Sequence, residues 1–382
     1  MRLLILHQAG VFGGAERTTH NLLSHLDRQV ISHLTLAAPG ALRAFMPARF
    51  DNFIDTAGLI QHGWFQDIPS LRADVNATEA LLRQARADVV LGMMHYSAAL
   101  VTFAARRLEK PPRVVGSFRG PIFEYIRRYE RGFSRRLFLH TAITLTARLA
   151  DCILVPSQGT ARDTRWRFFG AAKRIQVIPN GIDGAAVRQA AEAPAPGMEQ
   201  LPPDMPKLCV AARLTAEKDI HLVIEAMDRI RDKYPCSLII VGEGPEREAL
   251  ASRARDLRLA DRVVFAGFRE NVFPYLSRGD LYVHTCQFEG FGYAMLEAMA
   301  CGTPVIATDC PHGPREVLSG GRDGVLVAPG SAGTLAEGIA SILGDPERQQ
   351  QLVEKGLRRA EELSVRNMAD RYQSLFQSLV AN

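Results

Sequence analysis

The chain alternates short, continuously apolar runs with segments of helical pattern, and it does so in two successive blocks. In the first block the runs that read as strands are Leu3–Leu6, His33–Ala37, Asp88–Leu91, Arg113–Gly116, Asp151–Val155 and Gln176–Ile178. Candidate helices such as Glu16–Leu26 and Thr78–Arg86 lie between them. Parallel strands are buried on both faces and are joined by helical crossovers. The alternation therefore predicts a parallel sheet covered by helices on both faces.

Residues 183–206 break this pattern with five prolines, at positions 194, 196, 202, 203 and 206. Proline removes backbone donors and blocks regular elements, so we expect a linker here. The alternation then restarts, with strands expected at Lys207–Ala211, Ser237–Val241, Val263–Phe265, Leu281–His284, Pro304–Ala307 and Gly324–Val327. The expected helices are Ile220–Lys233, Glu246–Asp256, Gly292–Ala300, Ala332–Leu343 and Asn367–Val380.

The expected fold class is α/β, with two doubly wound Rossmann-like domains facing each other across a cleft. The first domain spans residues 1–182 and the second 207–364. A C-terminal helix lies in 365–382, and the sequence leaves open whether it packs back on the first domain. Ligands of such sheets bind at the carboxyl ends of the strands, where helix N-termini present free N–H groups.

Charge is divided unevenly between the two halves. Residues 1–200 carry 25 basic and 16 acidic side chains, whereas residues 201–382 carry 21 and 25. This split suggests that the first half meets an anionic partner. The net charge of +5 is too small to argue for nucleic acid, and no nucleic-acid-binding motif appears.

Other protein classes are disfavoured by composition. With 47% hydrophobic and 23% charged residues, the chain is globular and not disordered. Its apolar runs are all shorter than the roughly 18 residues of a spanning helix, and the start reads as a strand and not as a signal peptide. The six cysteines form no CxxC pair, which indicates a reduced cytoplasmic protein without structural zinc.

In each of the two predicted domains, a possible anion-binding element follows the first strand. Gly13 and Gly14 follow the first strand and open a helix, so backbone N–H groups there can approach an anion, although the spacing is not that of a dinucleotide fingerprint. Arg213 and Lys218 follow the first strand of the second domain and can converge on a diphosphate. Taken alone, an ordinary turn and a pair of solvated cations explain these residues as well.

Two carboxylates stand eight residues apart in the segment Glu289-Gly-Phe-Gly-Tyr-Ala-Met-Leu-Glu297. Glu289 lies in a glycine-rich loop after a strand, and Glu297 lies about two turns into the next helix. Carboxylates accept hydrogen bonds from vicinal hydroxyls, so this pair suits the two sugar rings of a nucleotide sugar. The apolar helix around Glu297 argues against two surface glutamates, because a buried carboxylate needs a partner. The loop 308–316 should line the same site.

Several motifs occur in the order and spacing of a known family. They are GGAER at 13–17, IPNGID at 178–183, R-x4-K at 213–218, VGEGP at 241–245 and the stretch EGFGYAMLEAMACGTPVIATDCPHGPRE at 289–316. Together they resemble the retaining glycosyltransferases of GT-B fold, the "glycosyl transferases group 1" family of bacterial polysaccharide and lipid-linked oligosaccharide transferases. The resemblance covers nearly the whole chain.

The resemblance implies roles for particular residues. Arg213 and Lys218 would bind the donor diphosphate and stabilise the leaving group, so no metal or other cofactor is expected. Glu289 would contact the transferred sugar and Glu297 the ribose hydroxyls. The implied chemistry is front-face transfer with retention, in which a donor phosphate oxygen takes the acceptor proton. Further donor contacts are expected from Gly13, Gly14, Gly290, Phe291 and Gly292.

The first domain departs from the family at one point. Many relatives carry a histidine after the strand at 113–116, whereas this chain has Ser117-Phe118-Arg119-Gly120-Pro121. Arg119 is then a candidate contact for acceptor or donor phosphate. His95, after an earlier strand, is an alternative site residue, with a plain loop histidine as the competing interpretation. Glu16, next to the glycine loop, is a third candidate contact for the acceptor.

The segment 122–138 concentrates positive charge. Arg127, Arg128, Arg131 and Arg135 fall on one stripe if the segment is a single helix, and apolar side chains lie beside it. Such a helix is typical of contact with an anionic membrane surface or an anionic acceptor, although a solvated face is a common alternative. The expected partners are a nucleotide-sugar donor and a polyprenyl-diphosphate-linked or lipid A-type glycan acceptor. The expected place is the inner face of the cytoplasmic membrane, bound peripherally.

The sequence leaves alternatives open. A UDP-sugar is the first choice of donor and GDP-mannose the second. A nucleotide-sugar epimerase, a sugar-phosphate synthase or a soluble glucan synthase would use the same fold. A two-lobed sugar-binding protein without catalysis is the alternative from another class.

Overall fold

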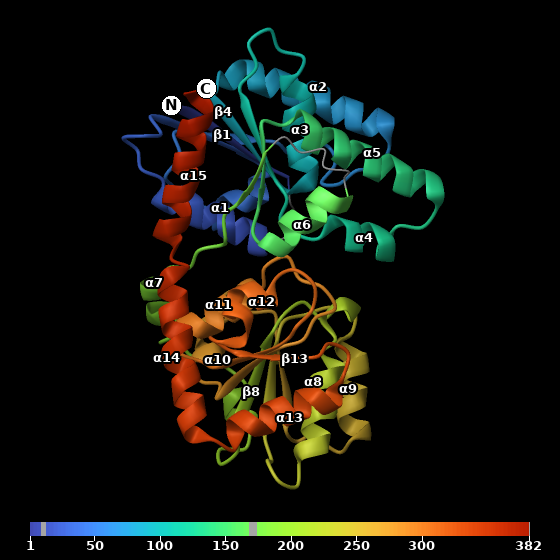
Figure 1. Cartoon of the computed structure of the whole chain (residues 1–382), viewed down its shortest axis with the longest axis vertical. Helices are drawn as coiled ribbons and strands as arrows, with labels where there is room; N and C mark the ends of the chain where they lie inside the picture. Colours follow the sequence, from blue (N-terminus) through green and yellow to red (C-terminus); the bar gives the residue numbers. More distant parts are fainter. Residues whose placement is uncertain (9–12, 168–173, 382) are drawn as a thin grey trace. The chain divides into compact units, whose positions relative to one another are not determined.

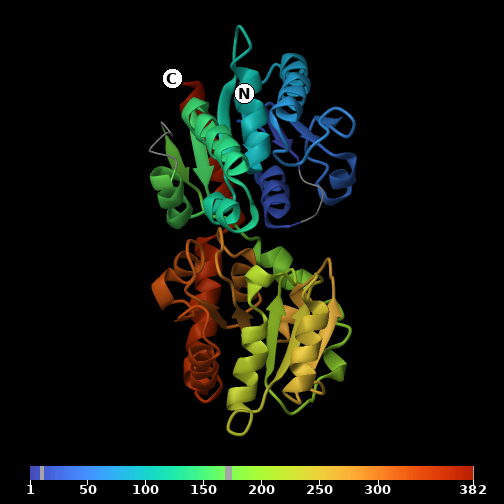
Figure 2. The same ribbon diagram turned by 90° about the vertical axis from the view of Figure 1, so that its right-hand side faces the viewer.

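The computed structural model describes residues 1–8, 13–167 and 174–381 of the chain. It divides into two compact units, one made of residues 1–181 with 365–382 and the other of residues 182–364. Each unit is an α/β layer structure built on one parallel sheet (Figures 1 and 2). The doubly wound fold predicted from the alternating pattern is confirmed in both units.

Unit 1 holds a seven-stranded sheet of order β3-β2-β1-β4-β5-β6-β7. Its strands are β1 (Arg2–His7), β2 (His33–Ala38), β3 (Asn52–Asp55), β4 (Val89–Met93), β5 (Arg113–Ser117), β6 (Cys152–Val155) and β7 (Ile175–Val177). Its helices are α1 (Gly14–His25), α2 (Ile68–Ala85), α3 (Met94–Ala105), α4 (Ile122–Tyr129), α5 (Phe133–Leu149), α6 (Gln158–Arg167) and α15 (Val365–Val380), with a 3-10 turn at Gly40–Phe45. The edge strand β3 was not predicted, because its sequence Asn-Phe-Ile-Asp has only two apolar residues.

Two cores flank the sheet of unit 1. Helices α2, α3 and α5 bury side chains such as Val75, Leu100 and Ile143 on one face. Helices α1 and α15 bury Leu22, Tyr372 and others on the opposite face. The C-terminal helix therefore belongs to the same unit as the N-terminal strand, and its red ribbon lies beside the blue α1 in Figure 1.

Unit 2 holds a six-stranded sheet of order β10-β9-β8-β11-β12-β13. Its strands are β8 (Lys207–Ala211), β9 (Ser237–Val241), β10 (Val263–Gly267), β11 (Leu281–His284), β12 (Val305–Thr308) and β13 (Val325–Val327). Its helices are α7 (Gly184–Ala190), α8 (His221–Ile230), α9 (Arg247–Asp256), α10 (Phe273–Ser277), α11 (Tyr293–Ala300), α12 (Pro314–Val317), α13 (Ala332–Leu343) and α14 (Pro346–Glu362). Short 3-10 turns occur at Met198–Gln200, Ala216–Lys218 and Ser319–Gly321.

The segment 183–206, predicted as a linker, is instead an integral part of unit 2. The carboxylate of Asp183 caps α7 by accepting hydrogen bonds from the N–H groups of Ala185 and Ala186. Val187 and Leu201 are buried in the core of unit 2. Burial of these two side chains holds the segment in the core of unit 2.

None of the helices in the described ranges is long and apolar enough to cross a membrane.

Candidate active site

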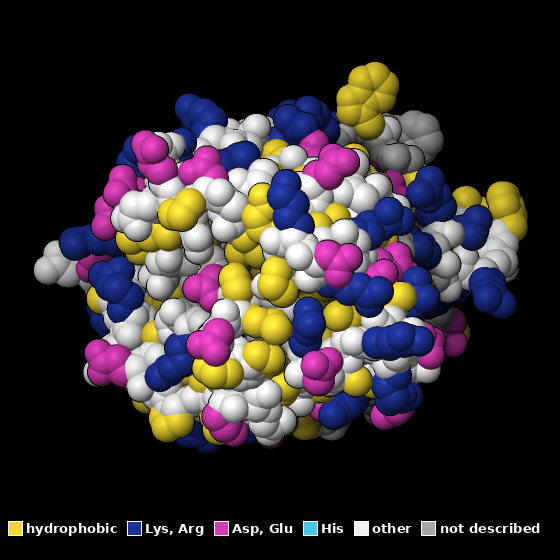
Figure 3. Space-filling view, turned by 90° about the horizontal axis from the view of Figure 1, so that it is seen from below, with side chains coloured by type: hydrophobic (Ala, Val, Ile, Leu, Met, Phe, Trp, Pro, Cys, Tyr) yellow, Lys and Arg dark blue, Asp and Glu magenta, His cyan; other side chains and the backbone are white. Residues whose placement is uncertain are grey.

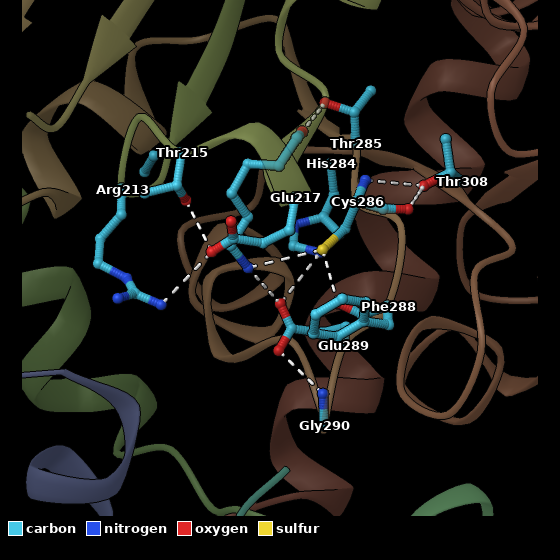
Figure 4. Close-up of polar contacts among 12 residues, drawn as sticks. Arg213, Thr215, Glu217, His284, Thr285, Cys286, Phe288, Glu289, Gly290 and Thr308 are labelled. Atoms are coloured by element: carbon cyan, nitrogen blue, oxygen red, sulfur yellow. Dashed lines mark hydrogen bonds and ion pairs between the residues drawn. The ribbon is translucent and has the colours of Figure 1, made fainter. Parts of the chain in front are cut away.

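The strand order of unit 2 reverses between β8 and β11. The chain runs outward from β8 through β9 to β10 and then returns to β11 on the other side of β8. The segments that follow β8 and β11 therefore begin side by side at the carboxyl edge of the sheet. In open α/β sheets this switch point is where ligands bind. Arg213 and Lys218 follow β8, and Glu289 follows β11, so the sequence motifs meet here (Figure 4).

A largely buried ion pair joins these two segments. Lys218 Nζ lies 2.8 Å from Glu289 Oε2, and the two side chains are only 16% and 20% exposed. Burial alone would raise the pKa of the Glu289 carboxyl, but Lys218 and His284 outweigh it and hold that pKa well below its usual range. Burial would likewise lower the pKa of Lys218, and Glu289 more than compensates, so the pKa is raised. Both groups are charged at neutral pH.

Hydrogen bonds between the two segments position the pair. The Thr285 hydroxyl donates to the carbonyl oxygen of Lys218 over 2.8 Å. The Gln287 N–H donates to the carbonyl oxygen of Glu217 over 2.9 Å, and its side-chain amide donates to Asp219 Oδ1 over 2.6 Å. The turn that carries Lys218 is thus tied to the loop that carries Glu289. Such preorganisation keeps charged groups in place without bound ligand.

Arg213 is more open to solvent than Lys218. Its side chain is 75% exposed, and its Nη2 lies 3.7 Å from Glu217 Oε1. The Thr215 hydroxyl donates to the same carboxylate oxygen over 2.7 Å. Figure 4 shows the guanidinium directed at Glu217. Arg213 therefore has most of its donors available to an incoming anion, whereas Lys218 is held in place.

The remaining donor-site candidates cluster around the start of α11. Glu297 on α11 and Phe291 before it are each 5% exposed. Gly292 caps α11 with a φ of 92°, and a Cβ there would come within 2.2 Å of Met295 Cε. The Gly290 N–H donates to Glu289 Oε1 over 3.0 Å. The positive φ favours glycine at position 292, because other residues rarely adopt it.

His284 and Cys286 belong to the site and were not predicted from the sequence. His284 Nε2 lies 3.6 Å from Glu289 Oε2, and Cys286 Sγ lies 3.7 Å from Lys218 Nζ. Their position directly at and after the end of β11, next to the glutamate motif, is the signal that would have found them.

The ligand atoms of His284, Cys286 and Glu289 all lie within 4.8 Å of one another, close enough to surround a metal ion. The Lys218 ammonium already contacts Glu289 and Cys286. A metal cation would meet this positive charge at short range. The cluster therefore suits the ammonium group better than it suits a metal.

The glycine loop of unit 1 lies at the corresponding switch point, between β1 and β4. Residues 10–12 of this loop lie outside the described residues. Gly13 caps α1 and Gly14 is its first residue, so the N-terminus of this helix lies at this edge of the sheet. Glu16, a predicted acceptor contact, is 4% exposed, and its carboxylate lies 3.0 Å from the buried His7 Nε2. The structure thus gives Glu16 a partner inside unit 1.

His95 lies at the start of α3, where β4 ends, and is 4% exposed. Its ring packs on Phe118 with centroids 4.6 Å apart, and its Nε2 has no hydrogen-bond partner in the described part of the chain. The preceding residue, Met94, has a φ of 71°, which is strained for a side chain of this size. An unpaired buried nitrogen beside a strained residue is typical of a functional site.

We expect His95 to remain neutral through the physiological pH range, because burial lowers its pKa to about 3. An unfolded histidine titrates near 6.5, so below that pH the unfolded chain binds more protons. The contribution of His95 to the free energy of unfolding should therefore be fully present above about pH 6.5. As the pH drops below about 6.5, the free energy of unfolding should fall by up to about 1.4 kcal/mol per pH unit. Ring signals followed by NMR should show no titration of His95 between about pH 5 and 8. A midpoint near 6.5 for His95 would contradict this account.

Arg119 is engaged inside unit 1. Its guanidinium donates to Asn180 Oδ1, to the Thr18 hydroxyl over 3.0 Å and to the Tyr372 hydroxyl over 3.3 Å. These partners come from α1, from α15 and from the segment that precedes the passage into unit 2. The arginine predicted as a phosphate contact therefore connects three parts of unit 1.

The basic segment is not the single helix on which its charge stripe was predicted. It forms two helices, α4 and α5, separated at residues 130–132, where Gly132 adopts a φ of 96°. Arg135 is turned inward and donates to the carbonyl oxygens of Phe65 and Gln66. Arg127, Arg128 and Arg131 remain exposed. The correction leaves a shorter basic surface on α4 and the following turn.

Comparison with known proteins identifies the family. The profile described as "Glycosyl transferases group 1" matches residues 196–359, and that described as "Glycosyltransferase Family 4" matches residues 12–185. The two matches together take in most of the chain. The chain belongs to the group 1 glycosyltransferases of GT-B fold.

Individual relatives are also similar. The lipopolysaccharide core biosynthesis glycosyltransferase LpsE of Rhizobium meliloti is 28% identical over 91% of this chain and 90% of its own length. An N-acetylgalactosaminyltransferase of Campylobacter jejuni, acting on a diphospho-undecaprenol-linked sugar, is 28% identical over 57% of this chain and 58% of its own length. The crystal structure of Anabaena Alr3699/HepE with UDP-glucose has a TM-score of 0.78 and 21% identity over 99% of this chain and all of that one. That likeness confirms the GT-B fold.

Proposed function

We propose that this protein is a retaining glycosyltransferase that moves a sugar from a nucleotide sugar to a lipid-linked or cell-envelope glycan, without a metal. UDP-sugars are the proposed donors, with GDP-mannose as the second choice. The observation that carries this proposal is the buried Lys218–Glu289 ion pair at the switch point of unit 2. The Rhizobium relative acts in lipopolysaccharide core synthesis and the Anabaena structure contains UDP-glucose, which supports the choice of substrates.

In the proposed complex the donor diphosphate meets Lys218 and Arg213. The exposed guanidinium of Arg213 can chelate two phosphate oxygens, while the Lys218 ammonium adds a fixed positive charge. Glu297 accepts hydrogen bonds from the ribose hydroxyls, and the N–H groups of Phe291 and Gly292 face the donor. The donor contacts predicted for Gly13 and Gly14 stay predictions.

Glu289 acts as a carboxylate throughout the reaction. Its lowered pKa prevents it from serving as a proton donor near neutral pH, so it accepts hydrogen bonds from the hydroxyls of the transferred sugar. The proton is then accepted by the donor substrate itself and not by a side chain of the protein. A donor phosphate oxygen takes the proton of the acceptor hydroxyl. At the same time the acceptor oxygen bonds to the anomeric carbon, and the bond from that carbon to the diphosphate breaks. The new bond forms on the face that the diphosphate leaves, which retains the configuration.

Charge compensation of the leaving diphosphate is assigned to Lys218 and Arg213. The Lys218 ammonium stands among Glu289, Cys286 and His284, the ligand cluster that a cation would otherwise use. We therefore expect transfer to continue when divalent ions are removed with a chelator.

The donor is best identified with a thermal-shift panel of UDP, GDP, ADP and their sugars. A ligand present at 100 times its Kd stabilises the folded chain by about 2.7 kcal/mol. We expect UDP and UDP-sugars to raise Tm most. A rise with ADP alone would redirect the donor assignment, and no rise with any nucleotide would contradict a nucleotide-sugar site.

The acceptor side of the proposal rests on one group of exposed residues, which we call the α4–α5 surface. It consists of Arg127, Arg128, Arg131, Phe133 and Leu137. The apolar members include Phe133, which is 83% exposed, and Leu137, which is 54% exposed. Basic charge beside exposed aromatic residues is typical of contact with anionic membrane surfaces. Over most of the face drawn in Figure 3, basic and acidic side chains are interspersed, as on a solvated surface. We propose peripheral binding at the inner face of the cytoplasmic membrane.

Reversing Arg127, Arg128 and Arg131 to glutamate should weaken binding to anionic vesicles. Each cation near such a surface contributes about 1 kcal/mol, so the triple variant should lose at least about 3 kcal/mol, roughly a hundredfold in partitioning. Flotation with vesicles of anionic phospholipid measures this loss. The matched control reverses three exposed arginines of unit 2, Arg255, Arg258 and Arg322, and should float as the unmodified protein does.

Equal flotation of both triple variants would remove the α4–α5 surface from the account. If the unmodified protein does not float but transfers sugar to a soluble glucan or sugar phosphate, the soluble synthase alternative applies.

A further inference from the structure

Five aromatic side chains of unit 1 form one connected row that runs from the core to the surface. Ring centroids lie 5.0 Å apart for Tyr96 and Phe65, 5.4 Å for Phe65 and Trp64, 5.4 Å for Trp64 and Tyr125, and 5.0 Å for Tyr125 and Tyr129. These separations fall in the range of favourable aromatic pairs. Tyr96 and Phe65 are buried, whereas Tyr125 and Tyr129 are 40% and 43% exposed. We call the outer three rings, Trp64, Tyr125 and Tyr129, the aromatic surface.

The aromatic surface is built from segments that leave the sheet at its carboxyl edge. Trp64 lies between β3 and α2, and the two tyrosines lie four residues apart on α4, which follows β5. Strands β3 and β5 belong to one parallel sheet, so both segments begin at the same edge. In open α/β sheets this is the edge at which ligands bind. A substrate of unit 1 is therefore expected on this side of the sheet.

The segment between β3 and α2 is held in place from two sides. The buried carboxylate of Asp74 accepts hydrogen bonds from the N–H groups of Gln61, over 3.0 Å, and His62, over 3.2 Å. The same carboxylate accepts a hydrogen bond from the Tyr96 hydroxyl over 2.6 Å. Arg135 on α5 donates to two backbone carbonyl oxygens of the segment. The segment is therefore ordered before a ligand binds, which lowers the entropic cost of binding.

The partial exposure of the tyrosines favours a sugar ring over a lipid tail. Phe133, on the α4–α5 surface, is 83% exposed and protrudes as an inserting side chain does, whereas Tyr125 and Tyr129 keep more than half of their surface buried. A pyranose ring carries C–H bonds on its faces and hydroxyls at its rim. Its faces can pack against aromatic rings, and its rim can exchange hydrogen bonds with tyrosine hydroxyls. The aromatic surface therefore fits a hexopyranose.

We propose that the aromatic surface is a sugar subsite of unit 1, on which one hexopyranose ring of the glycan acceptor stacks. The assignment of that sugar to an acceptor rests on the function proposed above, whereas binding of a sugar at these rings does not. No bond is made or broken at this subsite, and its role is to hold the acceptor. Loss of one ring should therefore raise the acceptor KM and leave kcat nearly unchanged, because the binding removed is common to the ground state and the transition state.

Tryptophan fluorescence gives a direct readout, because the chain has only two tryptophans. Trp166 on α6 is 84% exposed, and Trp166→Phe leaves Trp64 as the single reporter. The Trp64 indole N–H has no hydrogen-bond partner among the described residues, so packing contacts position this ring and a sugar stacked beside it changes its surroundings. The full chain is titrated with the methyl glycosides of glucose, galactose, mannose and N-acetylglucosamine. We expect a saturable change in the emission of Trp64 with at least one of them.

Leucine replacements remove the aromatic faces and keep apolar bulk in their place. In the Trp166→Phe background, Tyr125→Leu and Tyr129→Leu should each raise the Kd of the responding glycoside roughly tenfold, since leucine has no ring face. Tyr125→Phe keeps the ring and should bind nearly as the parent does. Phe45→Leu is the matched control, because its ring is 38% exposed in the 3-10 turn Gly40–Phe45, outside the aromatic surface. Thermal unfolding of each variant shows that it is folded.

An unchanged Kd in both leucine variants, or no response of Trp64 to any of the four glycosides, would overturn the subsite. Loss of flotation with anionic vesicles by the leucine variants, with unchanged glycoside affinity, would show a membrane contact instead. If glycosides bind as expected while the protein neither transfers sugar nor binds nucleotides, the proposed function fails and the subsite stands. If transfer occurs with an unchanged acceptor KM in both leucine variants, the aromatic surface does not hold the acceptor and the proposed function stands.

Discussion

Glu289→Ala is expected to lower kcat/KM for sugar transfer roughly a thousandfold, which corresponds to about 4 kcal/mol of transition-state stabilisation. The substitution removes the carboxylate that holds the sugar hydroxyls and leaves the Lys218 ammonium without its closest anion. Steady-state kinetics on the identified donor measures the loss. The change should appear mainly in kcat, because a group that positions the reacting sugar acts most strongly in the transition state.

A loss of folding has to be separated from a loss of chemistry. Removing one partner of a buried ion pair costs about 3–5 kcal/mol of stability, so thermal unfolding of the variant is measured alongside its kinetics. Glu225→Gln is the matched control, since Glu225 pairs with Arg253 on α8 and α9, within the same unit but outside the site. Wild-type turnover by folded Glu289→Ala would refute the assignment of Glu289.

Lys218→Met should cause a loss of similar size, again roughly a thousandfold in kcat/KM. The side chain keeps nearly its length and loses its charge, so the leaving diphosphate has one compensating cation fewer and Glu289 loses its closest cation. Arg213→Met removes a charge that is 75% exposed and should therefore cost less. Kinetics with both variants gives the comparison.

The order of these two effects is the decisive feature. If Arg213→Met is the more damaging change and Lys218→Met is nearly silent, the buried ion pair is a structural contact and Lys218 does not bind the diphosphate.

The fold could be predicted because the strands of parallel sheets are continuously apolar, as in Leu3–Leu6 and Ser237–Val241. Two segments misled the prediction. Five prolines in 183–206 suggested a linker, but the Asp183 cap and the buried Val187 and Leu201 attach it to unit 2. The stripe of arginines in 122–138 suggested one helix, but Gly132 divides it.

The candidate site was predictable as a set of motifs and not as a set of contacts. Lys218 and Glu289 are 71 residues apart in the chain, and only the strand order β9-β8-β11 brings them within 2.8 Å of each other. Residue types carry no such long-range information. The contacts of Arg119 with α1 and α15 are likewise long-range and could not be predicted from the sequence. His284 and Cys286, by contrast, lie within five residues of Glu289 in the chain and could have been predicted from that position.

The most direct test of the central claim is nucleotide release from UDP-sugars and GDP-mannose by the purified protein, in the presence of bacterial lipid extract and a metal chelator. The account predicts release by the unmodified protein and almost none by Glu289→Ala. Absence of release from every donor, or equal release by the two proteins, would contradict it.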